Sequence, residues 1–288
     1  MTCPYTATYP SIDGAQDPYP FYAYLRTEAP VYQEPGTNRY LLSRREHILH
    51  VLGNPQLFSS VDKVLGVKTQ VPGSAMIGLD PPEHKPARDI GFLPFKPGRL
   101  RSHEVMIREV ADRLIDKFVG DGHVELFRQF AAPLSADVTC NLLGLPTEGL
   151  DDLYRHAAAV STGSGIAYLP DDDKQVSRES WAKMTEFVGS EVTARVTSPR
   201  DDALSDMLKL QLERDGHRDV QYVLEQAVTV LLGGITTTAH LIANAMASLL
   251  QAPDQLAKLQ ANHRFLPKMI EEAMRLESPA QWIPRRVT

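Results

Sequence analysis

The stretch Leu231-Leu-Gly-Gly-Ile-Thr-Thr-Thr-Ala-His240 lies in the middle of the longest apolar helical pattern in the chain. That pattern runs from 219 to 250 and would form a helix about 45 Å long, enough to cross a domain. It is apolar nearly all round, which predicts a central helix. Its middle is a poor helix former, because each glycine costs about 1 kcal/mol relative to alanine in a helix interior. The β-branched threonines add smaller penalties.

Two interpretations explain these residues. Glycine lets a flat or bulky ligand approach the backbone closely, and threonine hydroxyls can bond to the carbonyl one turn back or hold water. A local widening of the helix would then open a polar notch in an apolar wall. Alternatively, Gly233 and Gly234 serve tight helix–helix packing and the threonine hydroxyls are satisfied within the helix. The stretch alone leaves both interpretations open.

Helical periodicity also dominates outside this stretch, and strand signal is scarce. A short hairpin is expected from Val31–Gln33 and Arg39–Ser43 around a turn containing Pro and Gly. The fold class predicted is mainly α with a small β region near the N-terminus. The other expected helices are 17–29, 44–52, one starting at 81–82, 97–119, 126–143, 148–160, 174–196, 201–213, 253–260 and 266–276.

Composition excludes several classes of function. The chain has 288 residues and a net charge of −6, so it lacks the basic excess of a nucleic-acid binder. Its first residues carry neither the basic nor the apolar region of a signal peptide, and we expect no membrane span. The two cysteines, Cys3 and Cys140, form no disulfide framework and no metal-ligand spacing. We therefore expect a cytoplasmic protein.

The segment Asp80-Pro-Pro-Glu-His-Lys-Pro-Ala-Arg88 holds a second chemical signal. Asp80 can cap a helix whose first turn contains Pro81 and Pro82. His84 and Arg88 are then four residues apart and share one face. That face offers two cationic donors to one anion, such as a carboxylate. A charged surface turn is the alternative interpretation.

A third segment, Leu266-Pro-Lys-Met-Ile-Glu-Glu-Ala-Met-Arg-Leu-Glu-Ser-Pro279, places Glu272 and Arg275 three residues apart on one helix. They can form an ion pair, which is worth little if exposed and is costly to break if buried. Arg285 supplies a further cation after the next turn.

Taken in chain order, these three segments resemble the cytochrome P450 family. The segment Asp80–Arg88 resembles the start of the family's C helix. The run Gly233–Thr238 resembles its oxygen-binding I helix, and Glu272-Ala-Met-Arg275 resembles its K helix. Supporting similarities are Asn141–Pro146 and Pro199–Ser205. The resemblance covers nearly the whole chain and implies a single P450 haem domain over 1–288, incomplete at its C-terminus.

The resemblance also implies a function, a haem-dependent monooxygenase that inserts one oxygen atom from O2 into a small apolar organic substrate. Electrons would come from NAD(P)H through a redox partner, either a ferredoxin and its reductase or a fused reductase domain. No nucleic acid or membrane is expected as a partner. The residues implied are His84, Arg88 and Arg285 for the propionates of haem b, Gly233 and Gly234 for close approach of the macrocycle, Thr237 and Thr236 for catalysis, and Glu272 with Arg275 as a structural pair.

Two departures from the family pattern stand out. The family usually has Asp or Glu where this chain has Thr236, so a carboxylate relay is missing at that place. The chain also ends at Thr288, before the cysteine loop that would bind iron, and we read Cys140 as a core cysteine. No metal ligand is therefore assigned, and we expect the chain as given to be inactive. The alternative function is a haem-free binding or activator module that uses the P450 scaffold.

Overall fold

A computed structural model describes residues 17–35, 39–61, 75–163 and 171–288. The chain forms two compact units, one of residues 1–59 with 285–288 and the other of residues 60–284. The single domain over 1–288 stays a prediction. Two segments that we expect to shape substrate entry, 61–77 and 163–173, fall largely on residues 62–74 and 164–170, outside the described residues.

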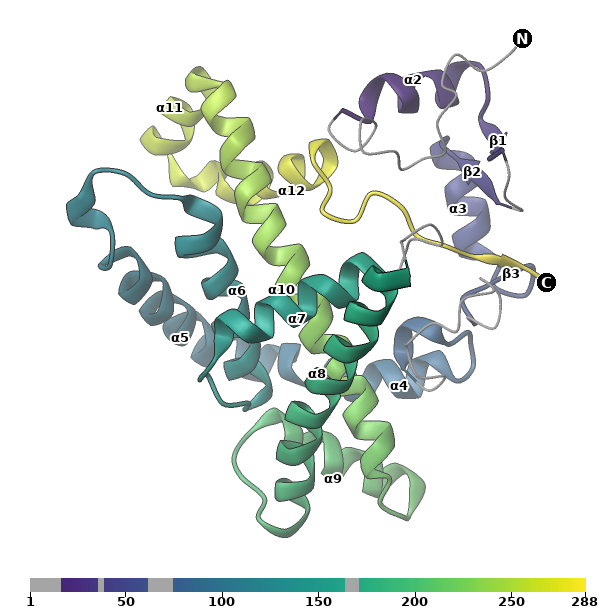
Figure 1. The fold of residues 1–288 in the computed structure, drawn as a ribbon, viewed down its shortest axis with the longest axis vertical. Helices are drawn as coiled ribbons and strands as arrows, with labels where there is room; N and C mark the ends of the chain where they lie inside the picture. The colour runs from purple at the N-terminus through teal and green to yellow at the C-terminus, as the bar shows by residue number, and fades with distance from the viewer. Residues whose placement is uncertain (1–16, 36–38, 62–74, 164–170) are drawn as a thin grey trace. The chain divides into compact units, whose positions relative to one another are not determined.

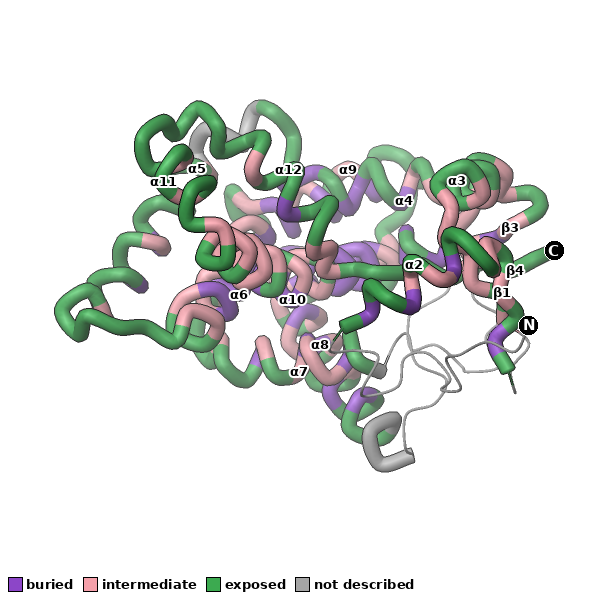
Figure 2. The backbone as a smooth tube through the Cα atoms, turned by 90° about the horizontal axis from the view of Figure 1, so that it is seen from above, coloured by how far each residue is buried: buried purple, intermediate pink, exposed green. Residues whose placement is uncertain are grey.

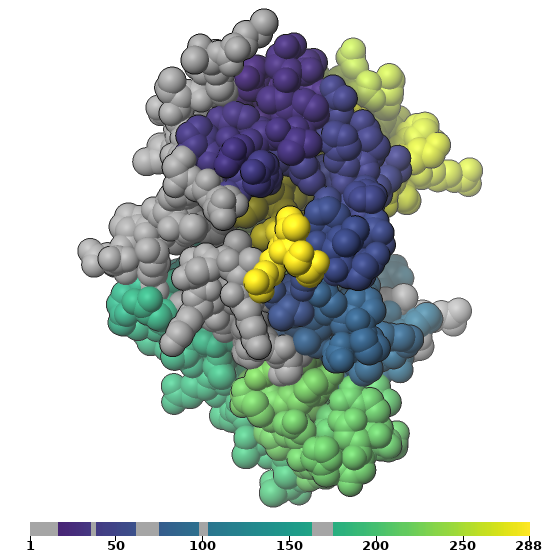
Figure 3. Space-filling view, turned by 90° about the vertical axis from the view of Figure 1, so that its right-hand side faces the viewer, coloured from purple at the N-terminus to yellow at the C-terminus, as the bar shows by residue number. Residues whose placement is uncertain are grey.

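The smaller unit contains the predicted hairpin and a second sheet that the sequence did not predict. β1 (Val31–Gln33) pairs antiparallel with β2 (Tyr40–Leu42), between helices α2 (Tyr19–Thr27) and α3 (Arg45–Gly53). β3 (Phe58–Ser59) pairs with β4 (Arg286–Val287). The Thr288 amide donates to the Leu57 carbonyl at 3.1 Å, and Figure 3 shows the yellow C-terminal residues against the blue N-terminal segment of this unit.

Among its described residues, the larger unit contains helices and connecting segments but no strand, which confirms the mainly α fold (Figure 1). The expected helix positions are confirmed, with ends that differ by a few residues. The long helices are α4 (His84–Gly91), α5 (Pro97–Ile115), α6 (Ala132–Leu143), α7 (Leu150–Gly163), α8 (Asp171–Thr197), α9 (Ala203–Asp215), α10 (Val220–Gln251), α11 (Pro253–Ala261) and α12 (Leu266–Leu276). Short turns of helix are η1 (Met76–Gly78), η2 (Leu93–Phe95), η3 (Val119–Asp121), η4 (Phe127–Ala131) and η5 (His263–Phe265).

Helix α10 is the helix around which the core of this unit forms. Asp219 caps its start by accepting from the Tyr222 amide at 2.9 Å. All residues from Val223 to Leu231 are buried, and α10 packs against α4, α6, α7, α8 and α9 (Figure 2). Each valine or leucine side chain buried there contributes about 1.5–3 kcal/mol. The prediction of a central helix holds for this first half, while residues 241–251 are partly or fully exposed.

By length and composition alone, α10 could also cross a membrane, which the sequence reading had not indicated. A core helix passes the same test. Because the first half of α10 is packed among five other helices, we interpret it as a core helix.

Two details of the expected helices are wrong. Asp80 is not a helix cap, because α4 begins at His84 and the Asp80 carboxylate instead accepts from the Ser60 amide at 2.8 Å. A cap bonds to amides two or three residues on, and Pro82 has no N–H. The local helix widening that belongs to one interpretation of α10 is also absent, since 220–251 is a continuous α-helix. A π-helical turn occurs instead at η4, directly before α6.

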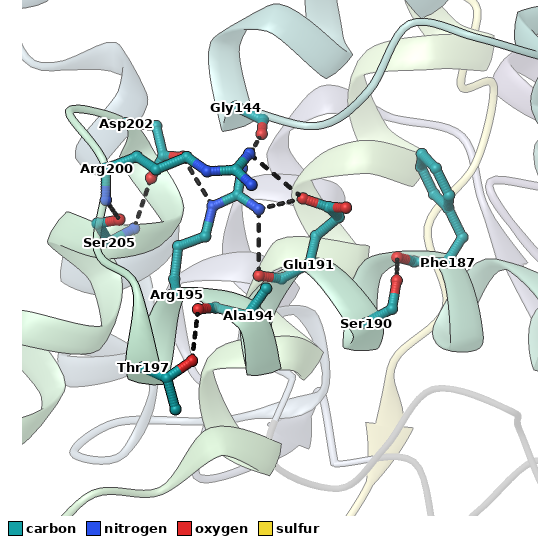
Figure 4. A network of polar contacts seen from close by, with 10 residues as sticks. All are labelled: Gly144, Phe187, Ser190, Glu191, Ala194, Arg195, Thr197, Arg200, Asp202 and Ser205. Carbon is teal, nitrogen blue, oxygen red and sulfur yellow. Dashed lines mark hydrogen bonds and ion pairs between the residues drawn. The ribbon is translucent and has the colours of Figure 1, made fainter.

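A buried arginine joins α8, α9 and the end of α6 (Figure 4). The Arg195 side chain is 1% exposed and forms ion pairs with Glu191 and Asp202, the latter at 2.9 Å. It also donates to the Gly144 carbonyl at 2.5 Å. Burial by itself would lower the pKa of Arg195, but the hydrogen bonds to Glu191 and Asp202 raise it above its ordinary value. The segments 141–146 and 199–205 therefore meet at one guanidinium.

Substitution of Gly144 tests how closely α6 and the start of α9 pack at this junction. Its φ is +83°, and a Cβ there would lie 2.5 Å from the Asp202 Cβ. We expect Gly144→Ala to lower the free energy of unfolding by roughly 2–5 kcal/mol, from backbone strain plus overpacking. Gly216→Ala is the matched control, because Gly216 has φ +73° with no atom within 4 Å. It should cost only about 1–2 kcal/mol. Urea denaturation measures both, and equal losses would contradict the close contact.

Candidate functional site

The two glycines in the middle of α10 have different surroundings. A Cβ at Gly234 would lie 2.6 Å from Thr139 Oγ1 on α6, so this glycine permits close packing of the two helices. A Cβ at Gly233 would meet nothing within 4 Å. Each interpretation of the stretch therefore applies to one glycine. Helix packing accounts for Gly234, and its expected role at a cofactor stays a prediction, while Gly233 remains open to a ligand.

Thr237 lies one turn after Gly233 on the open side of α10. Its hydroxyl donates to the Gly233 carbonyl at 2.5 Å, which satisfies the donor within the helix. The oxygen keeps acceptor capacity. Gly233 and Thr237 together make a small, open, hydroxyl-bearing face that directly follows the buried first half of α10.

Thr236 has a different environment from Thr237. It is 4% exposed, and its hydroxyl lies 3.2 Å from that of Ser161, an exposed residue near the end of α7. The place where the family pattern has a carboxylate is thus occupied by a pair of neutral hydroxyls. One turn on, His240 stacks on Phe127 of η4, with ring centroids 5.3 Å apart and planes 24° apart. Burial lowers the pKa of His240, and the Thr236 carbonyl partly opposes this.

Helix α4 presents His84 and Arg88 on one face, as predicted. Neither side chain has a hydrogen-bond or ion-pair partner among the residues that the structure describes. The Arg88 guanidinium lies over the Phe92 ring, 3.8 Å from its centroid. Because α4 packs against α10 through the buried Ile90 and Gly91, the two cations and the open stretch of α10 belong to one unit of the fold.

The predicted pair on α12 forms, but it is exposed. Arg275 donates to both oxygens of Glu272 at 2.7 and 2.8 Å, and the side chains are 65% and 55% exposed. The hydrogen bonds from Arg275 lower the pKa of Glu272. A pair so exposed contributes little stability. In the described residues, α12 is held to α10 instead by the buried Ala273 and by Asn244, which donates to the Glu277 carbonyl at 3.0 Å.

The remaining predicted residues lie elsewhere. Arg285 precedes β4 in the smaller unit, so its proximity to His84 and Arg88 stays a prediction. Cys140 is fully buried in the core of the larger unit, and burial with the nearby Asp137 charge raises the pKa of its thiol to about 12. It is a core cysteine, as predicted. Cys3 lies outside the described residues, and those residues contain no cluster of three metal-ligating side chains.

No protein-family model matches the chain. It is 30% identical over 280 residues to the vitamin D(3) 25-hydroxylase of Pseudonocardia autotrophica, covering 95% of this chain and 68% of that protein. It is 31% identical over 282 residues to cytochrome P450 107B1 of Saccharopolyspora erythraea, covering 92% and 67%. The chain belongs to the cytochrome P450 family. This P450 is also similar in structure to myxobacterial cytochrome P450 CYP267B1 in complex with myristic acid, with a TM-score of 0.82, 25% identity, and 95% and 70% of the two chains covered.

Membership of the family fixes the class of activity. This P450 is an oxidoreductase, a haem-dependent monooxygenase, and its fold is the mainly α P450 fold that the sequence predicted.

Three residues of this P450 site escaped the sequence reading. Thr139 and Ser161 reach α10 from helices that lie roughly 75 to 95 residues earlier in the chain, so no local pattern links them to it. Phe92 carried a usable signal, because an aromatic residue four positions after Arg88 lies one turn further along the same face.

The packing role of Gly234 can be separated from that of Gly233 by stability measurements. Gly234→Ala should lower the free energy of unfolding by roughly 1–3 kcal/mol through overpacking against Thr139. Gly233→Ala should instead stabilise the haem-free protein by about 0.5–1 kcal/mol, because its helical position is open. Adding Thr139→Ala to Gly234→Ala should restore part of the loss. If the loss persists unchanged in that double variant, the Thr139 contact is not its cause.

Proposed function

We propose that this P450 inserts one oxygen atom from O2 into a small apolar organic substrate, with haem b held by residues of α4 and α10. Electrons would come from NAD(P)H through a ferredoxin and its reductase or through a fused reductase domain. The substrate class rests on two relatives, a hydroxylase named for vitamin D3 and a structure that contains myristic acid. We propose a cytoplasmic location.

The observation that carries the cofactor assignment is the pair of cations on α4. His84 and Arg88 are one turn apart, and no described carboxylate neutralises either of them. A planar guanidinium fork suits a carboxylate such as a haem propionate. Gly233 adds a backbone that a flat macrocycle can approach without meeting a side chain. The residues present therefore fit haem b. By resemblance, Arg285 is proposed as a further propionate ligand.

Within this activity, bound haem supplies the binding and activation of O2. Thr237 would hold a proton or a water molecule at Oγ1 on the open face of α10. Thr236 would play a lesser part, because its buried hydroxyl is paired with Ser161 and cannot act as an acid near neutral pH. Glu272 and Arg275 are proposed as a structural pair.

The first test is a reduced, carbon-monoxide difference spectrum. It is recorded on the 288-residue chain and on protein expressed from the complete gene. A Soret band at the thiolate-ligated position in the complete protein is the expected result. A folded, helical protein with no haem band in either form would contradict the proposal, since His84, Arg88 and Gly233 would then have no macrocycle to bind.

The role of Thr237 predicts a specific defect. Thr237→Ala should lower the product formed per NADPH consumed by about 10- to 100-fold, because the hydroxyl oxygen that positions a proton-donating water molecule is lost. Haem content should stay unchanged. Electrons should be recovered as hydrogen peroxide, which a colorimetric assay with a surrogate ferredoxin and reductase measures. Thr238→Ala is the matched control, an exposed threonine one residue on. Equal peroxide release from the two variants would argue against Thr237.

A further inference from the structure

The side chain of Arg88 rests on an aromatic ring. Its guanidinium carbon lies 3.8 Å from the centroid of the Phe92 ring, a cation–π distance. The two residues are one helical turn apart, and the Phe92 amide donates to the Arg88 carbonyl at 2.8 Å. With no described anion beside Arg88, the ring is the group that fixes the plane of the guanidinium.

The backbone that carries the Phe92 ring is tightly packed. Phe92 is 38% exposed, while the residues around it, Ile90, Gly91, Leu93 and Pro94, are buried. A Cβ at Gly91 would lie 3.0 Å from the Met76 side chain, so the end of α4 is tightly packed at this point. Phe95 lies beside Phe92 with ring centroids 5.6 Å apart. The backbone under Phe92 is therefore held, although the ring reaches solvent.

We infer that Phe92 is a positioning residue that holds the Arg88 guanidinium ready to receive a propionate carboxylate. This rests on the proposed function. A free arginine side chain loses much rotamer freedom when it binds, and a stacked one has lost part of that freedom beforehand. Stacking on a ring face leaves the N–H groups at the edge of the guanidinium plane available to accepting oxygens. Phe92 acts only through Arg88, so its effect should depend on the carboxylates of haem.

The test compares two ligands on protein expressed from the complete gene and prepared without haem. Hemin carries both propionates, whereas hemin dimethyl ester keeps the iron and the macrocycle but has no free carboxylate. Phe92→Leu should weaken hemin binding by about two- to five-fold, the worth of an exposed cation–π contact. It should leave the affinity for the dimethyl ester unchanged. Arg88→Ala should weaken hemin binding further and also spare the ester.

Two further variants make the result specific. The Phe92→Leu, Arg88→Ala double variant should bind hemin no more weakly than Arg88→Ala alone, because the ring has then lost the group that it positions. Phe92→Trp should retain wild-type affinity, since tryptophan is a better cation–π partner. Phe265→Leu, which changes a phenylalanine that is 47% exposed on η5, is the matched control and should have no effect.

The outcomes separate the two proposals. If Arg88→Ala weakens hemin and the dimethyl ester equally, the propionate role of Arg88 fails, and the proposed function loses its anchor. If Arg88→Ala shows the expected ligand dependence but Phe92→Leu changes neither affinity, the inference about Phe92 is overturned. It is also overturned if Phe92→Leu weakens both ligands alike, or if its effect adds in full to that of Arg88→Ala.

Discussion

The close contact between α10 and α6 at Gly234 and Thr139 sets the geometry on which the rest of the site depends. The Thr139 hydroxyl donates a hydrogen bond to the Ser135 carbonyl within α6, so its interaction with α10 is mainly steric. A side chain larger than that of glycine at position 234 would be too close to Thr139. This contact fixes the rotation of α10 about its axis. At 100° per residue, Gly233 and Thr237 then share one face, with Gly234 and Thr236 on either side of it. Packing at one glycine therefore decides which residues stay open.

The fold separates the residues that provide stability from those that carry chemistry. The first half of α10 and the Arg195 side chain are buried, and Arg195 is bonded to Glu191, Asp202 and the Gly144 carbonyl. His84 and Arg88, in contrast, have no hydrogen-bond or ion-pair partner among the described residues, and a Cβ at Gly233 would meet nothing within 4 Å. Side chains of that kind contribute little to folding, and their presence is better explained by a ligand than by the core.

Much of this fold could be predicted from the sequence, because the periodic spacing of apolar residues within a helix can be recognised from that segment alone. The start of α4 could not, since the missing N–H of Pro82 matters more than the cap preference of Asp80. Strands of two residues, such as β3 and β4, have no period to detect. Within the site, the spacing of His84 and Arg88 was readable. The different surroundings of Gly233 and Gly234 were not, because they depend on the partner helix.

The burial of position 236 explains why a threonine is favourable where the family pattern has an acid. Thr236 is almost fully buried beside the Ser161 hydroxyl, and a carboxylate in its place would be a buried charge without an ion-pair partner, which is costly. A threonine that shares a hydrogen bond with Ser161 avoids that cost and keeps the contact between α7 and α10 independent of pH. The same choice removes a titratable proton source from α10. Proton supply on the open face then rests on Thr237 and on water, which is why the hydroxyl of that one residue should matter so much to the efficiency of the reaction.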